Sequence, residues 1–142
     1  MFSIVFNVKG LTPVFDQLAT FAEVTAYTAT AEVVMSEIRR KTGEGVDSDN
    51  VAFHPYSVAY AKWRKRHGHQ TERVDLWITG KLMNELYYNL QYKSVMASEE
   101  TQKIAHGLQV NPKAKYHRNF IGVGLDIYPK IETRLVAELS KV

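Results

Sequence analysis

The sequence predicts a single α+β domain over residues 1–142, in which a small antiparallel sheet packs with a long N-terminal helix and a C-terminal helix. This class is favoured by short segments of alternating apolar residues, longer segments with apolar residues at helical spacing, and turn-forming stretches between them. A chain of 142 residues, 45% of them hydrophobic, is long enough to bury one substantial core. No internal repeat or long linker divides it.

The first expected element is a half-buried strand at residues 2–9, where apolar and polar side chains alternate. Its apolar side consists of Phe2, Ile4, Phe6 and Val8, and Val5 is the exception to the alternation. Gly10 then ends the strand.

A long helix is expected next, because no residue breaks a helical pattern between Pro13 and about Lys41. Thr12 and Pro13 are typical of an N-cap and a first helical position, and Gly43 is the expected C-terminal stop. Several threonines lower the helix propensity, so packing must hold this helix. The predicted buried stripe consists of Phe15, Leu18, Ala22, Ala26, Ala29, Val33 and Ile38.

Residues 43–75 read as a helical and loop insertion, or arm, that projects from the domain. Turn-forming residues fill 42–55, helical spacing follows from Tyr56 to Arg66, and Gly68 opens a second polar stretch that ends at residue 75.

After this insertion, Thr79 is a plausible N-cap for a short helix that carries Leu82, Met83 and Leu86. Residues 87–96 and 101–110 both show an alternating pattern and predict an antiparallel hairpin, with its turn at Ser98–Glu100.

The chain is expected to close with a glycine-containing turn at residues 122–124 and a final helix capped by Asp126. Pro129 falls in the first turn of this helix, where its missing N–H costs nothing. The apolar residues at helical spacing are Ile127, Ile131, Leu135 and Leu139.

Catalytic, metal and cofactor sites are not expected from the residue patterns. The chain has no cysteine and no GxSxG or phosphate-binding glycine motif, and its five histidines lack metal-ligand spacing. Residues 47–50 resemble the start of a calcium loop but lack its later glycine and glutamate, so a polar turn is expected. Because no leader and no long apolar span are visible, we expect a soluble protein. Because no catalytic constellation is visible, we expect that it is not an enzyme.

One segment concentrates the positive charge. The formal net charge is +3, yet five basic residues fall between residues 62 and 73, opposed there only by Glu72. Tyr56, Tyr60 and Trp63 are interleaved with them. Such a pattern can bind phosphates and stack on bases, and it is equally typical of a solvated helix face or of a surface that docks on an acidic protein.

Three segments, taken in order, resemble motifs of the virion morphogenesis, or tail-completion, proteins of tailed phages. Residues 54–66 (HPYSVAYAKWRKR) resemble the family pattern PYSPxYxKxK, with Val58 in place of a proline. Residues 75–86 (DLWITGKLMNEL) resemble a hydrophobic run ending LTGxLxxSL, with Ile78 for leucine and Glu85 for a small polar residue. Residues 114–122 (AKYHRNFIG) resemble the YAxxHxxG and RPFLG elements run together, with Asn119 where proline is usual.

This resemblance implies a small structural protein of the virion neck, at the head-proximal end of the tail. Such a protein assembles in the host cytoplasm as a ring, commonly a hexamer, and joins the tail to the head connector. The resemblance implies no enzyme activity and no cofactor. A tail-terminator ring that caps the tail tube is the alternative within phage assembly, and a small basic nucleic-acid-binding protein is the alternative of another class.

The hypothesis for a partner surface combines the basic segment with the last motif. Tyr56, Tyr60 and Trp63 would anchor the arm on an adjacent subunit, and the basic residues would meet acidic partner surfaces or DNA in the channel. The candidate interface residues are Tyr56, Tyr60, Lys62, Trp63, Arg64, Lys65, Arg66, Arg118 and Phe120.

Overall fold

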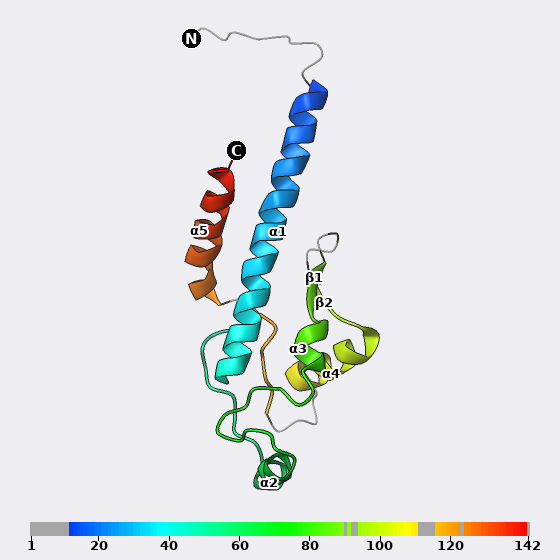
Figure 1. The fold of residues 1–142 in the computed structure, drawn as a ribbon, viewed down its shortest axis with the longest axis vertical. Coiled ribbons are helices and arrows are strands. Elements are labelled where there is room, and N and C mark those ends of the chain that lie inside the picture. Colours follow the sequence, from blue (N-terminus) through cyan, green and yellow to red (C-terminus); the bar gives the residue numbers. More distant parts are fainter. Residues whose placement is uncertain (1–11, 90, 92–93, 111–115, 123, 142) are drawn as a thin grey trace.

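The computed structural model describes residues 12–89, 91, 94–110, 116–122 and 124–141 (Figure 1). Its elements, in order, are α1 (Thr12–Glu44), α2 (Val58–Arg66), α3 (Lys81–Glu85), β1 (Tyr87–Asn89), β2 (Ser94–Met96), α4 (Glu99–Val110), the 3-10 turn η1 (Leu125–Ile127) and α5 (Tyr128–Leu139). The α+β class is confirmed. The strand predicted at residues 2–9 lies outside the described residues.

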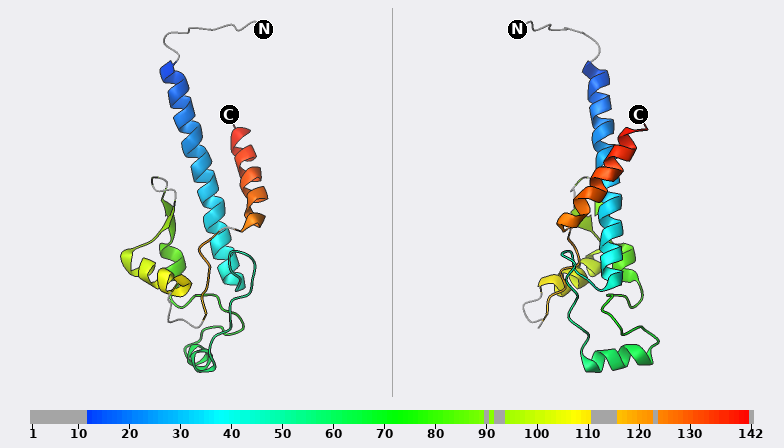
Figure 2. Two further views of the ribbon diagram at one scale, coloured as in Figure 1. Left: turned by 180° about the vertical axis from the view of Figure 1, so that it is seen from behind. Right: turned by 90° about the vertical axis from the view of Figure 1, so that its left-hand side faces the viewer.

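The long helix α1 is the axis of the molecule, and α5 lies antiparallel beside its C-terminal half (Figures 1 and 2). Ion pairs of Glu32 with Arg134 at 2.8 Å and of Glu37 with Lys130 at 2.7 Å join the two helices. The predicted stripe was only partly right, because Ala22 is exposed while Ala31, Val34 and Met35 are buried beside Ala29 and Ile38. A single stripe cannot describe α1, because α5 covers one side and the hairpin another.

The C-terminal stop of α1 is Gly45 rather than the predicted Gly43. Gly45 adopts φ +81°, its N–H donates to the Thr42 carbonyl at 3.1 Å, and the Val46 N–H donates to the Lys41 carbonyl at 3.0 Å. This pattern is the Schellman motif, which needs a residue that tolerates the left-handed conformation one position after the last helical residue. Both glycines satisfy the sequence rule, and the hydrogen bonds select Gly45.

A polar turn after α1 packs against the glycine segment near the C-terminus. The Asp47 carboxylate accepts from the backbone N–H groups of Asp49 and Val51 at 2.9 and 2.8 Å, which confirms the predicted polar turn. The buried Lys41 ammonium donates to the Ser48 carbonyl and to Asp126, both at 2.8 Å. Asp126 therefore pairs with α1 and does not cap the last helix as predicted: α5 has Ile127 at its N-cap.

The hairpin prediction placed the strands wrongly. Both strands fall within residues 87–96, with Tyr87 opposite Met96 and Asn89 opposite Ser94, while residues 99–110 form α4. Ser98 begins this helix, since its carbonyl accepts from the Gln102 N–H at 2.8 Å and its hydroxyl from the Thr101 N–H at 3.4 Å. Thr101 and Ala105 are buried at helical spacing, whereas His106, which fitted an alternating pattern, is exposed.

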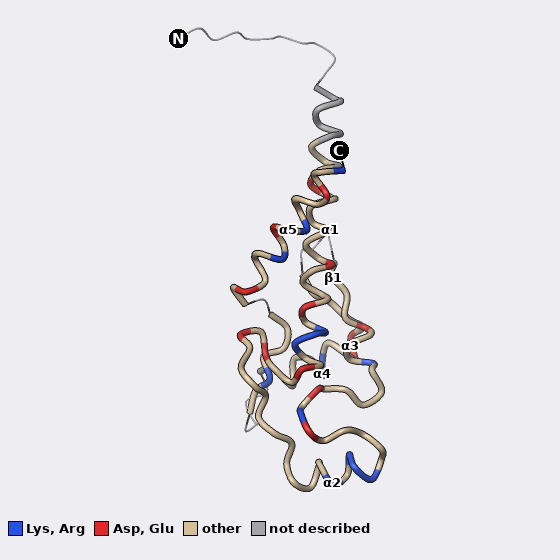
Figure 3. The backbone as a smooth tube through the Cα atoms, turned by 60° about the vertical axis from the view of Figure 1, so that its left-hand side comes forward, with Lys and Arg blue, Asp and Glu red and all other residues tan. Residues whose placement is uncertain are grey.

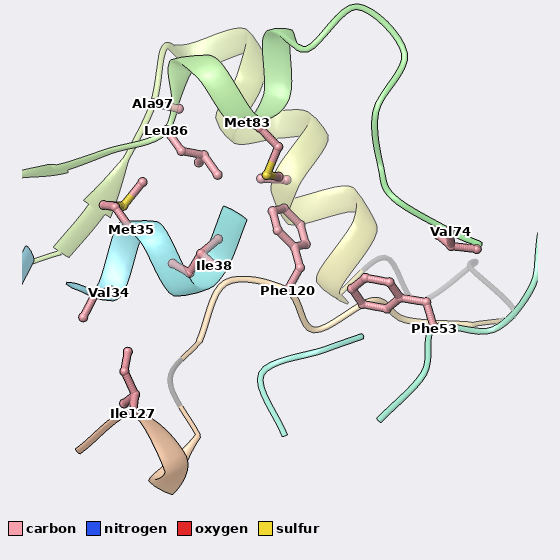
Figure 4. Packing of buried hydrophobic residues seen from close by; sticks show 11 residues of the cluster. Val34, Met35, Ile38, Phe53, Val74, Met83, Leu86, Ala97, Phe120 and Ile127 are labelled. Carbon is pink, nitrogen blue, oxygen red and sulfur yellow. The ribbon is translucent and has the colours of Figure 1, made fainter. Parts of the chain in front are cut away.

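One hydrophobic core connects these elements (Figure 4). Met35 and Ile38 of α1 face Met83 and Leu86 from the α3 region, and Phe120 lies between them and Phe53. Arg39 adds a polar tie, because its guanidinium donates to the Leu86 carbonyl at 3.2 Å. The short helix α3 begins one residue later than predicted, with Gly80 at the N-cap, although the Thr79 hydroxyl still accepts from the Lys81 N–H at 3.3 Å.

Two glycines provide a test of the close approach between the polar turn and the C-terminal segment. A Cβ added at Gly124 would collide with the Ser48 backbone carbonyl and lie 2.8 Å from the Asp126 carboxylate, whereas one added at Gly43 meets nothing within 4 Å. We expect Gly124→Ala to lower the free energy of unfolding by about 1–3 kcal/mol. Gly43→Ala, inside α1, should raise it by about 0.5–1 kcal/mol. Urea unfolding measures both, and equal effects would contradict the packing.

Candidate interaction surface

The arm predicted at residues 43–75 has other bounds in the structure, because residues 43 and 44 belong to α1. From here on, the arm is residues 46–80, which leave the end of α1, form α2 at the point farthest from that helix and return to α3 (Figures 1 and 2). Ser57 caps α2 by accepting from the Tyr60 N–H at 3.3 Å. At the other end Gly68 takes φ +75°, and its N–H donates to the Lys65 carbonyl at 3.2 Å. Both ends of α2 are therefore encoded locally, by a serine and a glycine.

The Arg64 side chain holds the arm together from inside. It is only 1% exposed. Its guanidinium donates to the Gln70 and Trp77 carbonyls, each at 2.9 Å, and to the Asp75 carboxylate at 3.1 Å. A planar fork with several donors suits this role, because it reaches three acceptors from one position. Arg64 thus joins α2 to residues 70–77, the segment by which the arm returns to α3.

Asp75 completes this buried cluster. It also accepts from the Trp77 N–H at 3.0 Å and the Tyr56 hydroxyl at 3.2 Å. Burial raises the pKa of the Asp75 carboxyl, but hydrogen bonds from the Trp77 backbone and the Gln70 side chain, together with the Arg64 charge, outweigh burial and hold that pKa below its usual 3.8. Burial raises the pKa of Tyr56, which therefore remains a hydrogen-bond donor near neutral pH.

Leu76 follows the cluster in a strained conformation, with φ +53°. A non-glycine residue in the left-handed region costs roughly 1–2 kcal/mol. The bonds that Arg64 and Asp75 make to the Trp77 backbone fix the chain on either side of it. As a result, Leu76 turns inward, where it packs against the core and lines a groove, while Trp77 and Ile78 remain exposed.

The groove lies between the arm and the α3–α4 pair and encloses about 800 Å³. One wall comes from residues 54–57, Tyr60 and Arg64, and the other from residues 78–82. Ile104 and Leu108 of α4 form the apolar floor, and Ile104 is 46% exposed. An open apolar groove of this size is typical of a surface that binds a partner.

Polar groups stand at the rim of this groove. Lys81 pairs with Glu100 at 2.5 Å, so its charge is balanced within the chain. The buried Nε of Arg118 has no hydrogen-bond partner among the described residues, and its guanidinium lies 5.9 Å from the Tyr56 ring centre. His54 stacks on Tyr116 with ring centres 3.3 Å apart. The groove therefore combines an apolar floor with one donor that lacks an acceptor.

A ladder of stacked rings runs along α2, beginning at Tyr60 in the groove wall. Trp63 stacks on Tyr60 with ring centres 5.6 Å apart and on His67 at 4.3 Å. Lys62, Lys65 and Arg66 are exposed on the same helix, which contains no acidic residue (Figure 3). Trp63 itself is 39% exposed. This outer face is both cationic and aromatic.

Two of the predicted interface residues are corrected by the structure. The Arg64 guanidinium is buried and hydrogen-bonded within the internal cluster, and Phe120, 2% exposed, belongs to the core. Neither side chain can meet a partner directly. The others lie on the arm or at the groove: Tyr56 and Tyr60 are partly buried in the groove wall, Arg118 is partly buried at its rim, and Lys62, Trp63, Lys65 and Arg66 are exposed on α2.

The apolar half of the surface was missed. Trp77 and Ile78 were read as a run preceding a helix, and Ile104 was assigned to a strand. The signal that could have found Ile104 is the Ser98-Glu99-Glu100 start, because serine followed by acidic residues is typical of a helix N-terminus. A helix at 99–110 would have placed Ile104 and Leu108 on one side.

Within the described ranges, no group of three or more histidine, aspartate or glutamate side chains is placed to hold a metal ion. No described helix combines the length and the hydropathy needed to cross a bilayer. Comparison of the chain with known protein families, with curated proteins and with solved structures found no significant match.

The Arg64 cluster predicts that lysine is a poor substitute. Arg64→Lys keeps the charge but loses most of the hydrogen bonds to Gln70, Trp77 and Asp75, so we expect a loss of about 2–4 kcal/mol in unfolding free energy and faster amide exchange in the arm. The matched control, Arg66→Lys on the exposed face, should stay within about 0.5 kcal/mol. Equal stability of the two variants in urea would contradict the assigned role of Arg64.

Proposed function

We propose that this protein is a structural subunit of a tailed-phage neck, which completes the tail and joins it to the head connector as part of a ring of identical copies. The proposal rests on the motif resemblance at residues 54–66, 75–86 and 114–122. A tail-terminator ring, which caps the tail tube, remains the alternative role within the same class.

One observation carries the proposal: the motif segments, far apart in the sequence, converge on one groove. Tyr56, Ser57, Tyr60 and Arg64 from the first motif lie across it from residues 78–82 of the second. Tyr116 and Arg118, from the third, stand at the same groove. A motif set that served only the core would place its residues inside. Here residues from all three motifs line one open groove, which supports a role in binding a partner.

The chemistry of this surface favours a protein partner. Aromatic residues and arginine are enriched in protein interfaces, whereas bulk surfaces are richer in lysine and glutamate. Trp63, Trp77 and Ile104 all expose apolar side chains around the arm and groove. The Arg64 cluster holds the arm in one shape before binding, which reduces the entropy lost on assembly.

The outer face of α2 provides the assembly test. Trp63→Ala combined with Lys65→Ala leaves Arg64 in place, so the double variant should remain folded by circular dichroism. Removing a central aromatic anchor costs about 2 kcal/mol or more of association free energy. We therefore expect rings of the unmodified protein, seen by electron microscopy and analytical ultracentrifugation, and smaller species for the variant.

A control changes one exposed apolar residue and one exposed lysine away from the arm. Val136→Ala combined with Lys141→Ala alters exposed positions at the C-terminal end of the chain, and its rings should persist. Rings that survive the arm substitutions, or a protein that never forms rings and is absent from the neck of purified virions, would overturn the proposal.

Nucleic-acid binding is a second candidate, favoured by the ladder of Tyr60, Trp63 and His67 beside three exposed basic residues. Lys62, Lys65 and Arg66 together would give a slope of log affinity against log salt of about −2 to −3. Fluorescence titration of duplex and single-stranded DNA at several salt concentrations measures this slope. Lys65→Ala should make it shallower by about 1, whereas binding that is weak and unaffected by the substitution would exclude this role.

A further inference from the structure

Each end of the molecule has an exposed surface: the first turns of α1 at one end and the open groove at the other. The N-terminal turns of α1 extend beyond the C-terminal end of α5 (Figures 1 and 2). Residues 19, 20 and 22–24 of this stretch are exposed, and Val24 is 51% exposed. The groove lies at the opposite end, beyond the C-terminal half of α1. A helix with few apolar contacts is marginal on its own, so the projecting turns call for a partner.

The sequence that precedes α1 is apolar on one side. Residues 2–8 alternate Phe2, Ile4, Phe6 and Val8 with Ser3 and Asn7, with Val5 as the exception, and residues 1–11 contain no acidic residue. An extended segment with this pattern has one face that is favourable to bury and one that tolerates water. The groove offers such an apolar floor.

Distance prevents this segment from filling the groove of its own chain. Arg39 bonds to the carbonyls of Met83 and Leu86, which marks the level of the nearest groove wall along α1. The helical rise puts Arg39 about 40 Å from Thr12. Residues 2–11, fully extended, span at most about 35 Å, so even Phe2 would fall short of that level.

We propose that residues 2–8 of a second copy dock in the groove between the arm and the α3–α4 pair. This inference rests on the proposed ring assembly and names one of the contacts that would build it, in addition to the outer face of α2. Phe2, Ile4, Phe6 and Val8 face the floor formed by Ile104 and Leu108. Among the described residues the Nε of Arg118 has no hydrogen-bond partner, and the backbone carbonyls of an extended segment in the groove are acceptors for it.

The chemistry selects this occupant over an anionic one. Two of the three Lys and Arg side chains that line the groove, Arg64 and Lys81, are already paired with Asp75 and Glu100, which reduces the positive charge that the groove offers a nucleic acid or an acidic peptide. An anionic ligand would also leave the apolar floor of the groove without an apolar contact. A segment without acidic residues and with an apolar face matches both properties.

The contact joins one end of each copy to the opposite end of the next. Such a head-to-tail interface generates a ring when the rotation between copies closes, and a filament when it does not. One wall of the groove is held in place by the Arg64 cluster, and this groove would receive the N-terminal segment of the next copy.

The absence of cysteine makes a direct test possible, because only introduced thiols can react. Differently tagged Ile4→Cys and Ile104→Cys proteins are mixed and oxidised, and the disulfide-linked heterodimer is scored on a gel. We expect it in this mixture. It should be absent when Ile4→Cys is mixed with Val136→Cys, an exposed position on α5 away from the groove.

A charge substitution gives a second measurement on the full-length protein. Phe6→Asp places a carboxylate on the apolar side of the segment and should weaken self-association at least about 30-fold. Asn7→Asp introduces the same charge on the other side and should leave association nearly unchanged. Analytical ultracentrifugation measures both.

The outcomes separate this inference from the function on which it rests. Rings that form without the cross-link, or that tolerate Phe6→Asp as well as Asn7→Asp, overturn the docking and leave the ring intact. A protein that stays monomeric and gives no cross-link overturns both. The cross-link together with selective loss on Phe6→Asp supports the docking.

Discussion

The buried guanidinium of Arg64 is the interaction on which the arm and its groove depend. It joins α2 to the carbonyls of Gln70 and Trp77 and to the Asp75 carboxylate, and through Trp77 it holds the strained backbone at Leu76. A buried charge is tolerated only when its donors are satisfied and its charge is compensated, and here both conditions are met. The cluster turns a polar loop into a surface of defined shape.

A second polar junction performs the same task at the end of α1. The Lys41 ammonium, nearly buried, binds the Ser48 carbonyl and Asp126, and Gly124 allows the two segments to approach. The apolar core of Met35, Ile38, Met83 and Phe120 lies between these two junctions. Apolar burial supplies most of the driving force, while the satisfied charges specify where each loop lies.

This arrangement relates the motifs to the proposed role in assembly. Residues from separate sequence segments meet around one open groove. The rings of Tyr60 and Trp63 stack on each other along α2 of the arm. A head-to-tail ring of identical copies needs two different, complementary surfaces on each copy. The apolar face of residues 2–8 and the floor at Ile104 and Leu108 fit those two parts.

Local chemistry was enough for the sequence to determine the α+β class, the long first helix, a helix ending at Arg66 before Gly68, and the concentration of basic and aromatic residues on the arm. These depend on periodicity and on caps within a few residues. The helix ending at Arg66 was predicted from Tyr56, whereas α2 begins at Val58 after the Ser57 cap. Only the tertiary structure decided that residues 99–110 form a helix, that Gly45 rather than Gly43 ends α1, and that Arg64 faces inward while Lys65 faces water. The inward orientation of Arg64 is decided by its hydrogen-bond partners at Gln70, Asp75 and Trp77. These residues become its neighbours only when the arm folds back, and no local sequence pattern predicts that fold.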